Sequence, residues 1–354
     1  MEAFSAAGAG LERFPEEIHA LPGLRRADLA WNRITAVPPE IGRLRELAIL
    51  RLDGNRLTGL PEEIGRLGAL RELHLDGNAL DAFPAALLGL TGLSTLSLYG
   101  NRIAALPAGL DRMAGLRHLS AGGNRLTGTP EGLWRLTGLR SLNLAENALT
   151  HIPDAIGRLR GLRMLDLGHN AIEHIPAAIG DLDGLTDYLY LSDNGFTAVP
   201  ASLGRLRRLA YLNLTDNRLT ELPASLGDLA ALVELRLYGN RLTALPASFG
   251  RLSSLRELHL RGNRLAALPE QIGRLDGLRV LDVRDNVLTR LPESVGGLTG
   301  LTHLDLRNNR LREIPGALAA LPRLEKLDLR WNKLDDPGSE PLHVLRGRGC
   351  AVLL

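Results

Sequence analysis

The sequence predicts an α/β solenoid, in which short strands of successive repeats stack into one parallel sheet. Fourteen asparagines recur along the chain; twelve of the thirteen intervals between them are 23 residues and one is 24 residues. A similar pattern of leucines, usually followed by a proline, surrounds each asparagine, and self-similarity at such a period is typical of stacked repeat proteins. A single unit of this size does not bury enough apolar surface to fold alone, so neighbouring units must share a core. The asparagines are Asn32, Asn55, Asn78, Asn101, Asn124, Asn147, Asn170, Asn194, Asn217, Asn240, Asn263, Asn286, Asn309 and Asn332.

The residues before each asparagine predict a strand. Apolar residues occupy the third and fifth positions upstream, as Leu75 and Leu73 do before Asn78. Polar residues occupy the second, fourth and sixth positions, and this alternation is typical of a strand with one buried face. We expect the asparagine amide to donate to and accept from backbone groups where the chain leaves the strand, because the stack would otherwise bury those groups unpaired.

The residues after each asparagine predict a short helical return. In one repeat Pro61 is followed by Ile64 and Leu67, which are three residues apart. That spacing suits a short helix or a 3₁₀ turn, and proline is tolerated in the first turn. Gly65 argues against a long regular helix. Each repeat is therefore one strand, one turn and one short helical segment.

We expect the repeats to form one continuous domain with a cap at each end. Residues 1–31 form a degenerate capping repeat and the first strand, residues 32–332 hold the tandem repeats, and residues 333–354 form the C-terminal cap. The 24-residue interval, residues 171–194, carries its extra residue between Leu185 and Leu189, where we expect a bulge or a widened turn. The coil that ends at Asn124 contains Gly122 and Gly123, so we expect a thin core and a weak sheet there.

Composition argues against several functional classes. The net charge of +2 on a 38.3 kDa chain is too small to predict nucleic acid or a membrane surface as the partner. Cys350 is the only cysteine, and the N-terminus lacks the basic start and long apolar run of a secretory signal, so we expect a cytoplasmic protein. No phosphate-binding, dinucleotide-binding, zinc-protease or paired-cysteine motif occurs in the sequence. We therefore expect neither an enzyme nor a bound cofactor.

The repeated frame, L-x-x-L-x-L-x-x-N-x-L-x-x-L-P-x-x-I-G-x-L, resembles the leucine-rich repeat family. With pairs such as Leu60-Pro61 and Ile64-Gly65, it resembles the 23-residue repeats of intracellular Ras-associated and Scribble-like scaffolds. The resemblance implies a curved horseshoe with the parallel sheet on the concave face and short helical or 3₁₀ segments on the convex face. It also implies that partners bind mostly on the concave sheet, and it makes a small GTPase or another signalling protein one candidate partner.

The tyrosines mark the candidate binding surface. All five fall at positions on the exposed side of the predicted sheet, and four of them belong to three consecutive repeats. Neighbouring strands lie about 4.8 Å apart, so these four rings can form one patch. Tyrosine is enriched at binding interfaces, although it also favours strands for packing reasons alone. The predicted partner-binding residues are Tyr188, Tyr190, Tyr211 and Tyr238, with Glu234, Arg236 and His259 on one side, Asp166 and His169 on the other, and Tyr99 in an earlier repeat.

Arginines and aspartates alternate near the C-terminus and predict a lattice of ion pairs. Such a lattice can simply keep the sheet soluble, since exposed pairs contribute little stability. It can also form a striped surface for a partner of complementary charge. The residues are Arg261, Arg284, Arg307 and Arg330 with Asp282, Asp305 and Asp328. Trp31 and Trp331 each directly precede an asparagine, where covering the end of the sheet and binding a partner are both open.

We therefore predict a non-enzymatic scaffold, a monomer that binds a protein or peptide on its sheet. An open surface roughly 60 to 70 Å long suits a macromolecule better than a small substrate. Three alternatives remain open. The first two are a bacterial effector-like protein and an architectural or engineered repeat array without a specific ligand. The third is a metal-dependent hydrolase built on His259, Asp282 and His303.

Overall fold

The computed structural model describes residues 2–21 and 23–354. The chain groups into two compact units, Met1–Ala171 and Ile172–Leu354. Each unit repeats a strand of three residues followed by a 3₁₀ turn of five residues. The predicted α/β solenoid is confirmed in both units, and the short helical segments are 3₁₀ turns.

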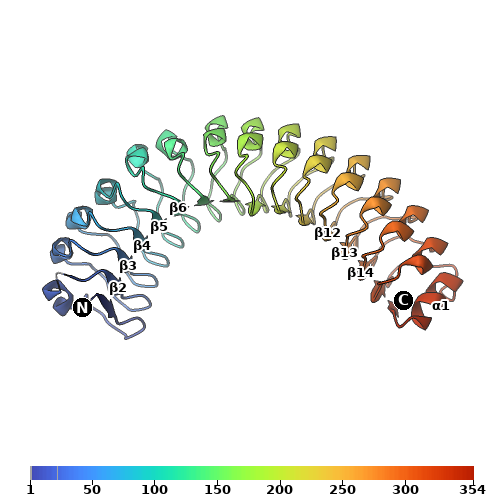
Figure 1. The fold of residues 1–354 in the computed structure, drawn as a ribbon, viewed down its shortest axis with the longest axis horizontal. Helices are drawn as coiled ribbons and strands as arrows, with labels where there is room; N and C mark the ends of the chain where they lie inside the picture. The colour runs from blue at the N-terminus through green and yellow to red at the C-terminus, as the bar shows by residue number, and fades with distance from the viewer. Residues whose placement is uncertain (1, 22) are drawn as a thin grey trace. The chain divides into compact units, whose positions relative to one another are not determined.

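In the first unit the strands line the inner side of the curve and the 3₁₀ turns line its outer side (Figure 1). Each strand pairs in parallel with the next one along the chain. The described strands are β1 (Ala3–Ser5), β2 (Arg26–Asp28), β3 (Ile49–Arg51), β4 (Glu72–His74), β5 (Thr95–Ser97), β6 (His118–Ser120), β7 (Ser141–Asn143) and β8 (Met164–Asp166). The described turns are η1 (Glu16–Ala20), η2 (Pro39–Arg43), η3 (Glu62–Arg66), η4 (Ala85–Gly89), η5 (Ala108–Arg112), η6 (Glu131–Arg135) and η7 (Asp154–Arg158).

The second unit continues the same alternation and ends with an α-helix and a last strand (Figure 1). Its strands also pair in parallel, each with the next. They are β9 (Tyr188–Tyr190), β10 (Tyr211–Asn213), β11 (Glu234–Arg236), β12 (Glu257–His259), β13 (Val280–Asp282), β14 (His303–Asp305), β15 (Lys326–Asp328) and β16 (Ala351–Leu353). The helical segments are η8 (Ala177–Asp181), η9 (Ala201–Arg205), η10 (Ala224–Asp228), η11 (Ala247–Arg251), η12 (Glu270–Arg274), η13 (Glu293–Gly297), η14 (Gly316–Ala320) and α1 (Glu340–Gly347).

In each unit, the buried side of the sheet is a ladder of leucines in register. In the second unit Leu212 pairs with Leu189 and Leu235, and all three side chains are fully buried. In the first unit Leu73 pairs with Leu50 in the same way. Because side chains alternate along a strand, the residues on either side of each leucine point to the opposite face of the sheet. That face carries the candidate site.

The repeated asparagine ties each coil to the one before it. The amide nitrogen of Asn217 donates to the carbonyl oxygen of Leu191 at 3.0 Å and to that of Leu214 at 3.1 Å. Its Oδ1 accepts a hydrogen bond from the amide of Phe196 at 3.1 Å. The side chain is only 6% exposed, so it satisfies backbone groups that water cannot reach. This is the role expected from the sequence.

The glycine of the Ile-Gly or Leu-Gly pair lets successive 3₁₀ turns stack closely. A Cβ atom at Gly227 of η10 would collide with the carbonyl oxygen of Ser248 in η11. Gly204 of η9 has the same relation to Ser225 of η10. Any larger residue would have to push the turns apart, so this glycine serves packing between coils as well as keeping each turn short.

The extra residue of the 24-residue interval lies immediately before β9. Thr186 and Asp187 separate Leu185 from this strand, whereas Val233 alone separates the corresponding leucine from β11. The carbonyl oxygen of Thr186 accepts a hydrogen bond from the amide of Ala210 at 3.0 Å. From Tyr188 onward, β9 then pairs with β10 in regular register.

An aromatic ring covers the glycine pair before Asn124. A Cβ atom at Gly122 would come within 2.9 Å of the Tyr99 ring, and one at Gly123 within 3.3 Å. The backbone ladder continues through this coil, since the amide of Ala121 donates to the carbonyl oxygen of Asn143 at 2.8 Å. The glycines therefore make room for the ring, and the sheet is not interrupted there.

A strand pairs with the neighbouring strand at each end of the described repeat array. In β1, Phe4 pairs with Ala27 of β2, and in β16, Val352 pairs with Leu327 of β15. Cys350 is buried beside β16, as expected for a small core residue. No helix in the described part of the chain has the length and apolar character needed to cross a bilayer.

Candidate partner-binding surface

Three tyrosines of β9 and β10 form an aromatic cluster on the face opposite the leucines. The ring centroids of Tyr188 and Tyr190 are 4.8 Å apart with an interplanar angle of 61°, and those of Tyr190 and Tyr211 are 5.0 Å apart at 46°. Such tilted contacts are favoured by the charge distribution of aromatic rings. All three side chains are half-buried. Burial raises the pKa of Tyr211, so its hydroxyl stays protonated at neutral pH.

Arg236 of β11 extends this cluster. Its guanidinium carbon lies 5.5 Å from the centroid of the Tyr211 ring, which is a cation–π contact. Its Nε donates to Oε1 of Glu234 on the same strand. Within the described residues no hydrogen bond falls on its two terminal nitrogens. The bond from Nε therefore holds the guanidinium in place. Its two terminal nitrogens remain available to a carboxylate or carbonyl oxygen of a partner.

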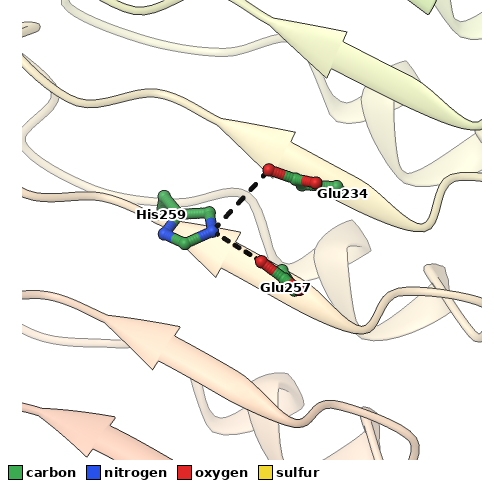
Figure 2. A group of neighbouring side chains, drawn as sticks. All are labelled: Glu234, Glu257 and His259. Carbon is green, nitrogen blue, oxygen red and sulfur yellow. Dashed lines mark hydrogen bonds and ion pairs between the residues drawn. The ribbon is translucent and has the colours of Figure 1, made fainter.

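The fourth predicted tyrosine joins through a histidine. Tyr238 lies two residues beyond β11, and its ring contacts His259 edge-on with centroids 5.7 Å apart. Figure 2 shows Nε2 of His259 facing two carboxylates. It lies 3.1 Å from Oε2 of Glu257 and 3.9 Å from Oε1 of Glu234. Glu234 thus contacts both Arg236 and His259.

A metal-dependent hydrolase finds little support in this geometry. His259, Asp282 and His303 line one hollow of about 280 Å³, but they do not gather into a ligand group in the part of the chain that the structure describes. The group that does gather there is Glu234, Glu257 and His259, whose ligand atoms lie within 4.8 Å of one another. Because Arg236 already neutralises Glu234, a cation would have to displace that arginine.

Three predicted residues belong to the first unit. Oδ1 of Asp166, at the end of β8, accepts a hydrogen bond from the amide of Gly168 at 3.0 Å, and burial raises the pKa of this aspartate. His169 is exposed and has a φ of 52°. The hydroxyl of Tyr99 donates to Oε1 of Glu146 at 2.7 Å, and this bond, with burial, raises the pKa of Tyr99 to about 12. Tyr99 thus has a local structural partner.

The ion-pair lattice forms in the second unit. The pairs are Arg284 with Asp282 and Asp305, Arg307 with Asp305 and Asp328, and Arg330 with Asp328. Asp328 is the anchor, because its side chain is only 2% exposed. Arg261 differs from the others, since its Nε donates to Asp285 at 3.0 Å instead of to one of the predicted aspartates.

Sequence reasoning missed Glu257 and Asp285. Glu257 occupies the same repeat position as Glu234, 23 residues earlier, and the two pair across β11 and β12. This repetition of glutamate in neighbouring repeats could have predicted that Glu257 belongs to the surface. Asp285 directly precedes Asn286 at a position that varies between repeats, so nothing in the frame singled it out.

Fold and surface together define a class of protein: a solenoid that displays variable side chains on parallel strands held by an invariant frame. A family model described as leucine rich repeat matches residues 22–80, 137–196, 186–242 and 207–265. A second model, described as leucine-rich repeat region, matches residues 247–339. The chain belongs to the leucine-rich repeat family. No curated protein matches it.

Several solved structures are similar over most of the chain. A leucine-rich repeat protein of Leptospira interrogans is 32% identical, with a TM-score of 0.92, over 99% of this chain and 95% of that one. The plant peptide hormone receptor RGFR1, in complex with RGF2, is 28% identical, with a TM-score of 0.77, over 96% of this chain and 60% of that one. The PEPR1–AtPEP1 complex is 26% identical, with a TM-score of 0.61, over 99% of this chain and 62% of that one.

Proposed function

We propose that the protein is a non-enzymatic scaffold that binds a protein or peptide through the tyrosine–arginine surface, defined as Tyr188, Tyr190, Tyr211 and Arg236. The observation that carries the proposal is the contact series that joins the three rings to the guanidinium. Tyrosine and arginine are enriched among the residues that dominate binding energy. Rings that already pack on one another lose little conformational freedom when a partner binds.

The likeness to receptors supports a peptide or protein as the ligand. RGFR1 forms a complex with the peptide hormone RGF2, and that receptor matches 96% of this chain. A row of strands about 4.8 Å apart can follow an extended partner over several repeats. The terminal nitrogens of Arg236 would hold a carboxylate or backbone carbonyl of that partner, while the tyrosine rings cover its apolar side chains.

Three narrower points belong to the same proposal. The frame's resemblance to Ras-associated scaffolds makes a small GTPase or another signalling protein one candidate partner. The single cysteine supports a cytoplasmic location, where disulfides are rare. The monomer is the simplest state for a chain whose repeats bury their leucines against one another. Cell fractionation and size-exclusion chromatography with light scattering test the last two points.

The test begins with affinity purification from the native cell and identification of the co-eluting protein. The dissociation constant of that protein is then measured for the wild type and for the Tyr190→Ala/Tyr211→Ala double variant. We expect the double variant to bind at least about tenfold more weakly. Because both rings are half-buried, thermal unfolding is recorded alongside, and Trp331→Ala serves as the control loss of an exposed aromatic ring outside the tyrosine–arginine surface.

Unchanged affinity in the folded double variant would contradict the proposal. Equal weakening by Trp331→Ala would also contradict it, because that ring lies outside the tyrosine–arginine surface.

A further inference from the structure

A second hollow lies in the first unit, at the ends of β3, β4 and β5. Its volume is about 430 Å³. The lining residues are Trp31, Arg51, Asp53, His74, Asp76, Gly77, Tyr99 and Gly100. None of the residues in the tyrosine–arginine surface belongs to it, so the hollow requires its own explanation.

Trp31 is held in an unfavourable backbone conformation and is nevertheless exposed. Its φ is 58°, in the left-handed region that a bulky residue rarely adopts, and 73% of its surface is accessible. Glycine occupies the equivalent position in the next coil, where Gly54 has a φ of 63°. Seven other non-glycine residues that directly precede a repeat asparagine also have a positive φ, so this conformation belongs to the repeat frame. The exposure of so large an apolar ring is what calls for an explanation.

The floor of the hollow consists of glycine backbone. The Trp31 ring lies over Gly54, because a Cβ atom at Gly54 would collide with it. A Cβ atom at Gly77 or Gly100 would meet only backbone atoms, at 3.6 to 3.7 Å. The two glycines therefore leave open space beside the ring, and Tyr99 bounds that space on the far side.

Two carboxylates, Asp53 and Asp76, line this space together with Arg51 and His74. Oδ1 of Asp53 accepts a hydrogen bond from the amide of Asp76 at 3.2 Å, and Oδ2 lies 3.8 Å from Nε of Arg51. Oδ1 of Asp76 accepts hydrogen bonds from Ser97 and Tyr99, but within the described residues none falls on its Oδ2. Burial and the neighbouring Asp76 raise the pKa of Asp53, and the charges of His74 and Arg51 offset this only in part.

We propose that this hollow binds an arginine side chain of a protein or peptide partner, with its guanidinium flat against Trp31 and its N–H groups donating to Asp53 and Asp76. A planar cation suits both features, because guanidinium stacks on aromatic faces and pairs with carboxylates. The two carboxylates disfavour an anion. The hollow and the tyrosine–arginine surface lie in different units, so either proposal can fail without the other.

The experiment uses the full chain and the peptide acetyl-Gly-Arg-Gly-amide as the probe. The indole N–H signals of the three tryptophans are followed by NMR, and Trp31→Phe assigns the signal of Trp31. We expect that signal to shift saturably, with a dissociation constant on the order of 1 mM for so small a ligand. Trp134 is fully buried and reports that the fold is intact.

The control peptide carries citrulline in place of arginine, which keeps the shape and removes the charge. We expect it to leave the Trp31 signal unmoved, and we expect Asp76→Asn to weaken binding of the arginine peptide about tenfold. Trp331 is a matched tryptophan, 69% exposed with a φ of 61° but beside Arg330, and its signal should not shift. Equal binding of the citrulline peptide, or no shift of Trp31 with the arginine peptide up to about 10 mM, would overturn the proposal.

Discussion

At the scale of single residues, the asparagine is the most consequential position in each repeat. Asn217 spans two coils through its amide nitrogen and its oxygen, and water does not reach it. Its removal leaves several buried backbone groups without a partner. The asparagine is thus a structural residue, and its recurrence signals the fold and carries no information about the ligand.

We predict that Asn217→Ala lowers the free energy of unfolding by about 3 kcal/mol, because unsatisfied buried backbone groups each cost about 1 to 3 kcal/mol. Urea unfolding at neutral pH measures the change. Arg218→Ala, at the exposed next residue, is the control and should change stability by less than about 0.5 kcal/mol. An equally small effect at Asn217 would show that water replaces the lost hydrogen bonds.

Asp328 makes stability depend on pH. Burial raises its pKa, but hydrogen bonds from Arg330 outweigh burial and bring the pKa below the usual 3.8. A carboxylate with a depressed pKa stabilises the folded state above the unfolded value, and this contribution is lost as the pH falls through the folded value. Asp328 therefore stabilises the protein at neutral pH and ceases to do so in acid.

Asp328→Asn should destabilise the protein by about 2 kcal/mol at pH 7, since hydrogen bonds to charged groups contribute about 1.5 to 3 kcal/mol. The difference from wild type should shrink at an acid pH below the usual aspartate pKa of 3.8, because protonation of the wild-type carboxyl group removes the same charge. Asp335→Asn removes a pair with Arg312 that is 54% and 71% exposed and should have almost no effect. A difference for Asp328→Asn that stays constant between the two pH values would contradict this account.

At the scale of elements, the close stacking of 3₁₀ turns sets the spacing between coils. In several coils a carbonyl oxygen of one turn approaches the glycine of the turn before it, as Ser248 approaches Gly227. Glycine here is required by a neighbour's backbone and not by its own dihedral angles. This explains why the Ile-Gly pair recurs even though glycine weakens a helix.

Gly227→Ala should lower the free energy of unfolding by about 1 to 3 kcal/mol, as expected when an added methyl group must push packed elements apart. Gly316→Ala offers a matched control within a 3₁₀ turn, because nothing lies within 4 Å of a Cβ atom there. That variant should be neutral or slightly stabilising. Thermal unfolding of the two variants decides the point, and equal stability would show that the stack can relax around the extra methyl group.

The strands and turns were predictable because the same pattern of leucine, asparagine and proline occurs about fourteen times in the sequence. The strand, the proline-initiated turn and the bridging role of the asparagine all appear in the structure where the frame places them, as at Leu212, Pro223 and Asn217. The site was less predictable. That Tyr190 and Tyr211 are neighbours follows from the register, but the arginine over Tyr211 and the ring of Tyr99 over Gly122 depend on side-chain rotamers, which the period does not specify.

At the scale of the whole molecule, an invariant frame presents side chains that vary from repeat to repeat. The leucines, asparagines and turn glycines maintain the stack, so the exposed strand positions can change without loss of the fold. Likeness to the Leptospira protein covers nearly all of both chains and therefore extends over both units. The matches to the plant receptors cover only about 60% of those longer chains. They therefore support a peptide or protein as the ligand and nothing more specific.

Site-specific photo-crosslinking tests the central claim most directly. A benzophenone-bearing phenylalanine replaces Tyr188 of β9 in one protein and the exposed Arg205 of η9, on the turn side of the same unit, in another. Each protein is irradiated in the native cell, and covalent adducts are identified by mass spectrometry. We predict that one partner is captured from position 188 and not from position 205. Capture of that partner from position 205 alone would contradict binding on the sheet.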